Sequence, residues 1–393
     1  MGGETWSGGS RSVKAVAARV ARVELFEYRR ALDGRSWNPV SRWDERRAPL
    51  LRITASDGAV GIGEAWSDQT RMSDLFAAAP PLVSQLLGRD ADDIEGIHRA
   101  TWQAAGPTAW TRAAIASAID VALWDLRARR MGAPLRAVLG TRDTAQVYAS
   151  GGLYGDGKDD AALADEMASY ARRGFTAFKM KIGALGLAAD LDRVRAVRRA
   201  LGPDAEIIVD AVGSLTPAAA PEWFAALHAC GVRAIQAPLP AHDLDGMTAL
   251  QRLGILDVVA QEAEFRPHAF RTLLDRGAVG WLQFNPALAG GITQALALIA
   301  QARARGVPVT LQCHATAVLQ ATCLHLATLP GVRSAEFHMF HDHLHACLPP
   351  AMSLLHDGVL RLGTEPGLGI DPRFLDRDLP DGGSLVRILA VPD

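Results

Sequence analysis

The sequence predicts an α/β protein, a (β/α)8-type TIM barrel preceded by an α+β capping domain. Two observations predict this fold. From about residue 145 onward, short apolar runs alternate with helical patterns, and eight such runs occur over roughly 220 residues. Polar residues also stand at the carboxyl ends of seven consecutive runs, as in barrels that carry a site at one face.

The eight predicted strands of the barrel are rich in apolar and β-branched residues. They read AQVYASGG, FTAFKMKIG, AEIIVDAVG, VRAIQAPLP, LDVVAQEAEF, VGWLQFNPAL, VPVTLQCHAT and RSAEFHMF. Several of the helical patterns between them end in glycine after a basic last turn, which is a typical helix stop. An open doubly wound sheet is the alternative, but eight is the number of strands that closes a barrel.

The segment before the barrel has a different pattern. VARVELFEY and LLRITASDGAVGIGEAW indicate antiparallel strands with a turn at Asp57–Gly58, and TRAAIASAIDVALWDLRARRMG indicates a long helix. We therefore expect a capping domain over residues 1–140, whose first twelve or so residues are disordered, and a barrel over residues 141–356. The Gly- and Pro-rich segment 357–393 is expected to return to the capping domain.

Composition excludes several classes of partner. A formal net charge of −2 gives no electrostatic basis for binding nucleic acid or an anionic membrane. No apolar run is long enough to span a bilayer. The four cysteines, Cys230, Cys313, Cys323 and Cys347, have no CxxC spacing, which favours a reduced, cytoplasmic protein.

The polar residues at the strand ends form a candidate site. Lys179 and Lys181 flank one residue of a strand, so their side chains share a face. The others are Asp210, Gln236, Glu262, Asn285, His314 and Glu336, separated by 26, 26, 23, 29 and 22 residues. Each interval is about one βα unit and returns the chain to the same height on the next strand. We therefore expect these side chains to meet at the barrel mouth.

This set of residues suits removal of a proton next to a carboxylate. Asp210, Gln236 and Glu262 offer oxygen ligands for a hard cation such as Mg²⁺, which would stabilise the resulting enediolate. Lys181 and His314 are candidate bases on opposite sides of that oxygen cluster. Lys179 is expected to contact the substrate and, as a neighbouring ammonium, to make Lys181 a better base.

At this point the sequence resembles the enolase superfamily, and within it the mandelate racemase-like subgroup. The motifs that carry the resemblance are DGAVGIGEAW, SAIDVALWDLRARRMGAPLRAVLG, GFTAFKMKIG, IIVDA, NPALAGGIT, QCHAT, AEFHMF and PGLGID. The resemblance implies Mg²⁺ as cofactor, Lys181 and His314 as acid/base groups, and Glu336 as a donor to the substrate carboxylate. It also implies cap loops near residues 30–45 and 62–66 that close on the substrate, and a homo-oligomer.

Three residues depart from the subgroup's pattern. Gln236 stands where a metal-binding glutamate is usual, and it offers a carbonyl oxygen without charge. Asn285 stands where an aspartate usually partners the histidine, and it is expected to orient the imidazole at most. Val212 replaces an asparagine beside Asp210. Glu264, two residues beyond Glu262, is expected to share its strand face and to restore a ligand.

Dehydration of a sugar acid or related hydroxy acid is the favoured reaction, with racemisation or epimerisation second. Lysine-based epimerases and cycloisomerases are disfavoured because they would carry a lysine at position 285. The alternative from another class is a ligand-binding barrel that has lost its metal and its turnover.

Residues near the barrel mouth are candidates for substrate binding. Trp37 in the cap loop, together with Glu264, His338 and His341, is expected to contact a small carboxylate substrate. The four histidines between residues 338 and 345 also raise the alternative of a separate transition-metal site.

Overall fold

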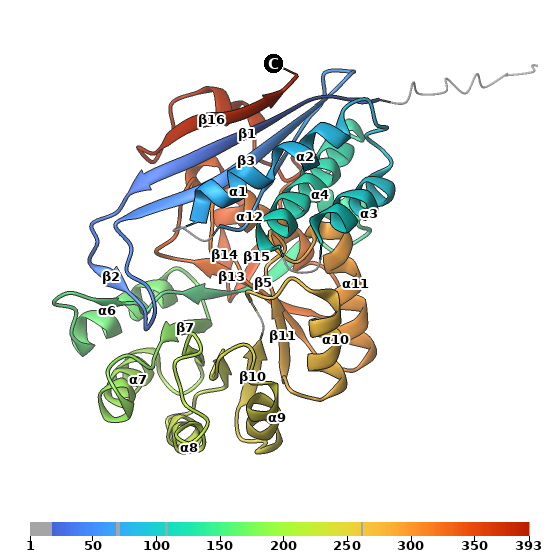
Figure 1. Cartoon of the computed structure of the whole chain (residues 1–393). Helices are drawn as coiled ribbons and strands as arrows, with labels where there is room; N and C mark the ends of the chain where they lie inside the picture. The colour runs from blue at the N-terminus through green and yellow to red at the C-terminus, as the bar shows by residue number, and fades with distance from the viewer. Residues whose placement is uncertain (1–17, 68–70, 107–108, 261, 393) are drawn as a thin grey trace, which may run out of the picture.

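The computed structural model describes residues 18–67, 71–106, 109–260 and 262–392. The barrel forms the lower part of the molecule in Figure 1, and the cap sheet and its helices cover it. The expected disorder of the first residues falls outside the described residues. None of the described helices is long and apolar enough to cross a membrane.

Eight parallel strands close into a barrel, and each corresponds to a predicted strand. Strand β13 pairs with β12 on one side and with β5 on the other, which completes the ring. The strands are β5 (Thr144–Ser150), β7 (Ala177–Lys181), β8 (Glu206–Asp210), β9 (Ala234–Gln236), β10 (Asp257–Ala260), β11 (Trp281–Phe284), β12 (Val309–Leu311) and β13 (Val332–His338). The closed barrel is confirmed, and the open sheet is excluded.

Helices cover the outside of the barrel after seven of its strands. They are α6 (Asp160–Arg172), α7 (Leu187–Leu201), α8 (Ala220–Ala229), α9 (Leu244–Arg252), α10 (Pro267–Asp275), α11 (Gly291–Ala304) and α12 (Ala317–Leu326). In the described chain β13 is followed by the short 3₁₀ turns His345–Cys347 and Pro350–Ser353, because the pair Pro349–Pro350 prevents a continuous helix.

Helix α7 shows how these helices are specified. Leu191, Val194 and Val197 recur at helical spacing and are buried against the barrel. Two arginines occupy the last turn, and Gly202 ends the helix at φ 82°, a conformation that glycine adopts without strain. Inside the barrel a separate apolar cluster includes Ile208, Val259 and Trp281.

The cap is a four-stranded antiparallel sheet with helices packed against it. Its strands are β1 (Val20–Ala31), β3 (Glu45–Ala55), β4 (Val60–Glu64) and β16 (Ser384–Val391), in the order β16-β1-β3-β4. Its helices are α1 (Met72–Ala78), α2 (Pro80–Val83), α3 (Ile94–Ala105) and α4 (Trp110–Arg130). A Cβ at Gly61 or Gly63 would lie 2.1 Å from a carbonyl oxygen of α4, so glycine permits this close packing. The turn at Asp57–Gly58 and the long helix are as predicted.

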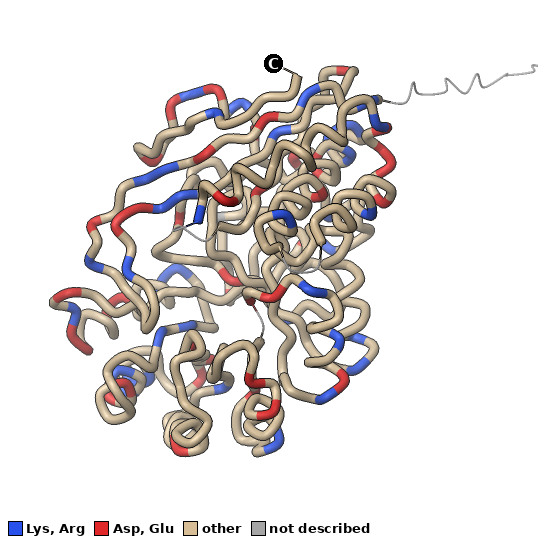
Figure 2. Tube along the Cα trace, in the orientation of Figure 1, with Lys and Arg blue, Asp and Glu red and all other residues tan. Residues whose placement is uncertain are grey.

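The C-terminal segment contacts both parts of the molecule. Strand β15 (Val359–Arg361) pairs with β5 at the barrel, and β16 then pairs with β1 in the cap. Basic and acidic residues are interspersed along the described trace, without a large region of one sign (Figure 2).

A short sheet fastens the cap loop to the barrel. Strand β2 (Ser36–Trp37) pairs with β6 (Tyr154–Gly155), and the ring of Trp37 stacks on Tyr154 at 4.6 Å. Arg42 adds two hydrogen bonds to the carboxylate of Asp156, at 2.8 and 2.9 Å. The loop is therefore held over the barrel mouth.

Candidate active site

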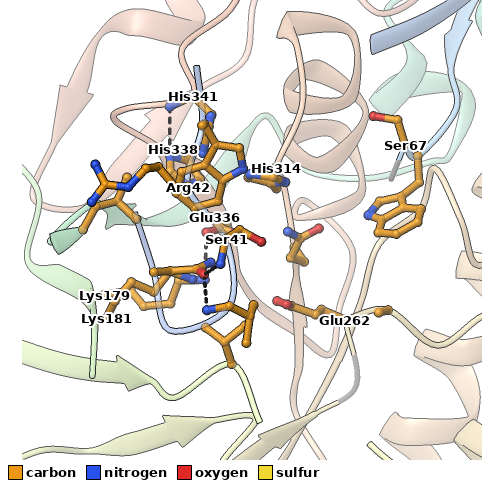
Figure 3. Close-up of a pocket in the computed structure, with 18 residues that line it drawn as sticks. Ser41, Arg42, Ser67, Lys179, Lys181, Glu262, His314, Glu336, His338 and His341 are labelled. Carbon is orange, nitrogen blue, oxygen red and sulfur yellow. Dashed lines mark hydrogen bonds and ion pairs between the residues drawn. The ribbon is translucent and has the colours of Figure 1, made fainter. Parts of the chain in front are cut away.

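A cavity of about 530 Å³ lies between the barrel mouth and the cap loop (Figure 3). Seven of the predicted site residues line it: Lys179, Lys181, Glu262, His314, Glu336, His338 and His341. Asp210 and Gln236 are buried beneath it, hydrogen-bonded to the lysines. The cap contributes Asn38, Val40, Ser41, Arg42, Trp43, Trp66 and Ser67, so both expected loop regions reach the cavity.

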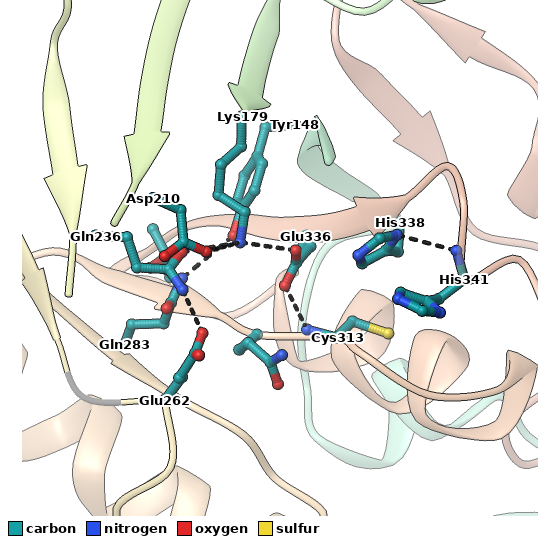
Figure 4. Close-up of polar contacts among 12 residues, drawn as sticks. Tyr148, Lys179, Asp210, Gln236, Glu262, Gln283, Cys313, Glu336, His338 and His341 are labelled. Atoms are coloured by element: carbon teal, nitrogen blue, oxygen red, sulfur yellow. Dashed lines mark hydrogen bonds and ion pairs between the residues drawn. The ribbon is translucent and has the colours of Figure 1, made fainter. Parts of the chain in front are cut away.

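Lys179 is a buried cation at the centre of a polar network (Figure 4). Its Nζ lies 2.8 Å from Oε1 of Gln236, 2.8 Å from Oε1 of Glu336 and 3.6 Å from Oδ2 of Asp210. Burial alone would lower the pKa of Lys179, but Glu336, Tyr148 and Asp210 act against it and raise that pKa well above its usual value. Lys179 is therefore a fixed positive charge.

Lys181 is the lysine that is more open to the cavity. Its side chain is 11% exposed, against 2% for Lys179, and its Nζ donates to Oδ2 of Asp210. The two residues face each other across strands β7 and β8, where Lys181 pairs with Asp210 in register. The backbone N–H of Val212 donates to the other oxygen of Asp210 at 3.0 Å. Asp210 thus fixes the ammonium that is positioned to move a proton.

The three expected metal ligands are neighbours. Asp210 and Gln236 are register partners, and the Gln236 amide donates to Glu262 while its oxygen accepts from Lys179. No group of three His, Cys, Asp or Glu residues able to hold a metal occurs in the described chain, and Gln236, the third expected ligand, is an amide. Burial and the charge of Asp210 raise the pKa of Glu262 to about 7. The carboxylates of Asp210 and Glu262 and the side-chain oxygen of Gln236, which accepts from Lys179 in this structure, form an all-oxygen donor set that fits a hard divalent cation.

Asn285 does not contact the histidine, and the expectation that it orients His314 is wrong. Its side-chain amide donates to Gln312, and its oxygen accepts from the backbone N–H of Ala287 at 2.8 Å. The polar contact of His314 comes from the cap instead. Arg46 donates to the His314 carbonyl oxygen, and its Nη1 lies 3.5 Å from both ring nitrogens.

Glu264 and Trp37 do not line the cavity, and their predicted roles there are wrong. The carboxylate of Glu264 accepts from the backbone and side chain of Arg266, at 2.7 to 2.8 Å, and lines a different depression. Strand β10 ends at Ala260, so the alternation that placed Glu264 beside Glu262 does not apply. Trp37 is held by Tyr154 in the short sheet, and Trp43 takes the place at the cavity wall.

His338 and His341 lie at the cavity wall, as predicted, beside His314. The ring of His341 meets those of His314 and His338 edge-on, with centroids 4.2 and 4.5 Å away. Burial is the largest cause that lowers the pKa of all three histidines well below the usual value. The described residues contain no cluster of three potential metal ligands from His, Cys, Asp or Glu, so the alternative of a separate transition-metal site gains no support.

Glu336 acts as an acceptor in this arrangement. It accepts from Lys179 at 2.8 Å and from the backbone N–H of Cys313 at 3.0 Å. The donor role that the resemblance implies stays a prediction. The sequence analysis did not identify Arg46 or Gln312 as site residues. Arg46 contacts His314 and Gln312 contacts Asn285, and no motif in the sequence predicts these contacts.

Val212 carries backbone strain at the cavity wall. Its φ is 52°, a left-handed conformation that is unusual for a β-branched residue. Asparagine tolerates this conformation, so we expect Val212→Asn to raise the free energy of unfolding by about 1 kcal/mol. Urea denaturation measures the effect, and Val212→Thr, which keeps the β-branch, is the matched control. An equal stability of the two variants would contradict the assignment of strain.

A capped barrel with lysines, carboxylates and a histidine around a cavity at its mouth is the architecture of barrel enzymes that catalyse acid–base chemistry. Comparison with known proteins identifies the family. Residues 162–376 match the family described as enolase C-terminal domain-like, and residues 39–140 match the mandelate racemase / muconate lactonizing enzyme N-terminal domain. The chain belongs to this family of the enolase superfamily, and it is an enzyme of the lyase or isomerase type.

Characterised relatives cover most of the chain. Arabinonate dehydratase of Saccharolobus solfataricus is 28% identical over 320 residues, which cover 81% of this chain and 86% of that protein. D-galactarolactone cycloisomerase of Agrobacterium fabrum is 29% identical over 366 residues, 89% of this chain and 95% of that protein. The crystal structure of a racemase from Streptomyces coelicolor A3(2) with bound magnesium is 27% identical, with a TM-score of 0.80, and covers 90% of this chain and 97% of that one.

Proposed function

We propose that this protein dehydrates a sugar acid by removing the proton α to its carboxylate. The observation that carries the proposal is the placement of Lys181, which faces the cavity, is fixed by Asp210 and has a buried permanent cation, Lys179, beside it. In the proposed reaction, neutral Lys181 accepts the α-proton as a general base. The electron pair left at Cα forms a double bond to Cβ as the β-hydroxyl leaves.

Mg²⁺ is the cofactor we propose, held by Asp210, Gln236 and Glu262. When bound there it would stabilise the negative charge that develops on the substrate carboxylate. A racemase of this family binds magnesium in its crystal structure, which supports this assignment. Lys179 provides a second, permanent positive charge on the same side of the cavity.

The cavity wall favours a polyhydroxylated acid over an apolar one. Hydrogen-bonding groups without charge face it from the cap and the barrel, among them Asn38, Ser41, Gln312, His338 and His341. Such groups recognise hydroxyls, whereas an apolar acid would leave them unpaired. The dehydratase and cycloisomerase relatives, which act on arabinonate and D-galactarolactone, support a sugar-derived substrate.

A screen of sugar acids in deuterated water with Mg²⁺ tests the proposal. NMR follows both the loss of the α-proton signal and the appearance of the dehydrated product. We expect at least one five- or six-carbon aldonic or aldaric acid to be dehydrated. Racemisation without dehydration would assign the second reaction of the family. Binding of acids without exchange or product would overturn the proposal in favour of a ligand-binding barrel.

A further inference from the structure

Arg46 is a buried guanidinium that contacts the candidate acid/base histidine. It lies on β3, reaches from the cap into the barrel mouth and is among the largest fully buried side chains. Its Nη2 donates to the carbonyl oxygen of His314, and its Nη1 lies 3.5 Å from each ring nitrogen. Its Nε has no hydrogen-bond partner among the described residues. A buried charge placed in this way is costly, and it acts strongly on the ring beside it.

The titratable groups that act on the His314 ring carry positive charge or are imidazoles. They are Arg46 from β3, Lys181 from β7, His338 from β13, and His341 and His343 from the loop that follows. Two acidic groups are bound to the backbone on either side of the ring. Glu64 accepts from the N–H of Thr316, and Glu336 accepts from the N–H of Cys313.

Among the residues that the structure describes, no carboxylate forms an ion pair with His314. In the described part of the chain the histidine–carboxylate pairs are His98 with Asp120 and His356 with Asp357. Asn285, at the position where the family usually has the acidic partner, is bonded to Gln312 and Ala287. The ring of His314 therefore has a cation where a carboxylate would stabilise its protonated form.

We propose that Arg46 is a positioning residue that replaces the acidic partner of His314 and fixes this histidine as a neutral imidazole, which leaves proton abstraction to Lys181 alone. The last part rests on the proposed function, whereas the charge state of His314 does not. Burial is the largest cause that lowers the pKa of His314, and the charge of Arg46 is the next. Both causes favour the neutral ring, as does the position of the Arg46 guanidinium 3.5 Å from its two nitrogens.

A single base has a defined consequence for the reaction. Lys181 removes the α-proton, the C–O bond at Cβ breaks, and the resulting Lys181 ammonium returns the same proton to the departing hydroxide. The products are an enol and water, and the lysine is again neutral. Neutral His314 donates or accepts one hydrogen bond and carries no additional proton. Interconversion of two epimers needs a protonated group on the opposite face, so this site favours dehydration over racemisation.

NMR of the full-length protein with ¹⁵N-labelled histidine tests the charge state without any substrate. The His314 signals are assigned by their loss in His314→Gln. We expect them to report a neutral ring from pH 5.5 to pH 8. In Arg46→Gln, which keeps a donor for the carbonyl oxygen but removes the charge, the midpoint should rise by about one pH unit or more. Arg46→Lys should keep the ring neutral, and Arg47→Gln, on the next residue of the strand, should change nothing.

Two results would overturn the proposal. One is a wild-type His314 that is charged at pH 7. The other is a midpoint in Arg46→Gln that stays where it is in the wild type. If Arg46→Gln fails to fold, the wild type and Arg46→Lys still decide the charge state. A separate assay in deuterated water should show exchange of one epimer only, and failure to find a substrate would count against the proposed function but leave the NMR result intact.

Discussion

Replacing Lys181 with arginine is expected to slow α-proton exchange by about 10²- to 10⁴-fold, the usual contribution of a general base. Arginine keeps a positive charge next to Asp210, which is fully buried and accepts from Lys181. It cannot lose a proton at any pH at which the protein is folded. The substitution therefore removes the base and retains the ion pair. Loss of the α-proton signal in deuterated water measures the rate for a sugar acid found in the screen.

The matched control is Lys158→Arg. Lys158 lies outside the cavity lining and pairs with Glu166, so its replacement should leave exchange within about twofold of the wild-type rate. Circular dichroism and the midpoint of thermal unfolding check that both variants are folded. Exchange by a folded Lys181→Arg protein at a rate within tenfold of wild type would mean that another group removes the proton.

The position of Lys181 could be predicted because a barrel converts sequence spacing into proximity. Strand alternation places Lys179 and Lys181 on one face, and the intervals of about one βα unit bring Asp210 and Gln236 to the same height. The pairing of Lys181 with Asp210, and of Asp210 with Gln236, realises this expectation. Helices and strands have a fixed rise per residue, so the sequence spacing within them predicts which side chains lie close together.

The same reasoning failed where the regular element ends. Strand alternation places Glu264 beside Glu262, but β10 stops at Ala260, and both glutamates lie beyond it. In that turn, the guanidinium of Arg266 captures the carboxylate of Glu264. Strand β10 has only four residues, so a small error in its predicted end reverses the expected direction of the side chains that follow.

Contacts between the cap and the barrel could not be predicted from spacing at all. Arg46 and His314 are 268 residues apart in sequence, and they meet because β3 of the cap lies over the mouth. Trp37 is drawn away from the cavity by the short pairing of β2 with β6, which involves two residues of each strand. Such contacts depend on how the cap packs on the barrel, and no periodic pattern in the sequence encodes that packing.

Replacing Gln236 with glutamate is expected to tighten Mg²⁺ binding by about tenfold or more. Gln236 lies between Lys179 and Glu262, and its oxygen is the neutral member of the proposed ligand set. One additional negative charge a few ångströms from a divalent cation contributes several kcal/mol of Coulomb energy, of which desolvation cancels a part. Titration calorimetry at pH 8 measures the affinity with Glu262 largely ionised, since its pKa is raised to about 7.

In the absence of Mg²⁺, the same substitution should lower the thermal stability of the protein. The new carboxylate would lie against Glu262 and near Asp210, and like charges in a buried site disfavour the folded state. Lys179 offsets only part of this repulsion, because its ammonium already pairs with Glu336 and lies near Asp210. Gln236→Glu should therefore unfold at a lower temperature than wild type in EDTA and gain more from added Mg²⁺. Gln236→Met, of similar length but without an oxygen, should lose cation affinity and show no such reversal. Equal Mg²⁺ affinity in all three proteins would mean that the side chain at position 236 does not face the cation, and the metal site would then have to be built from other oxygens.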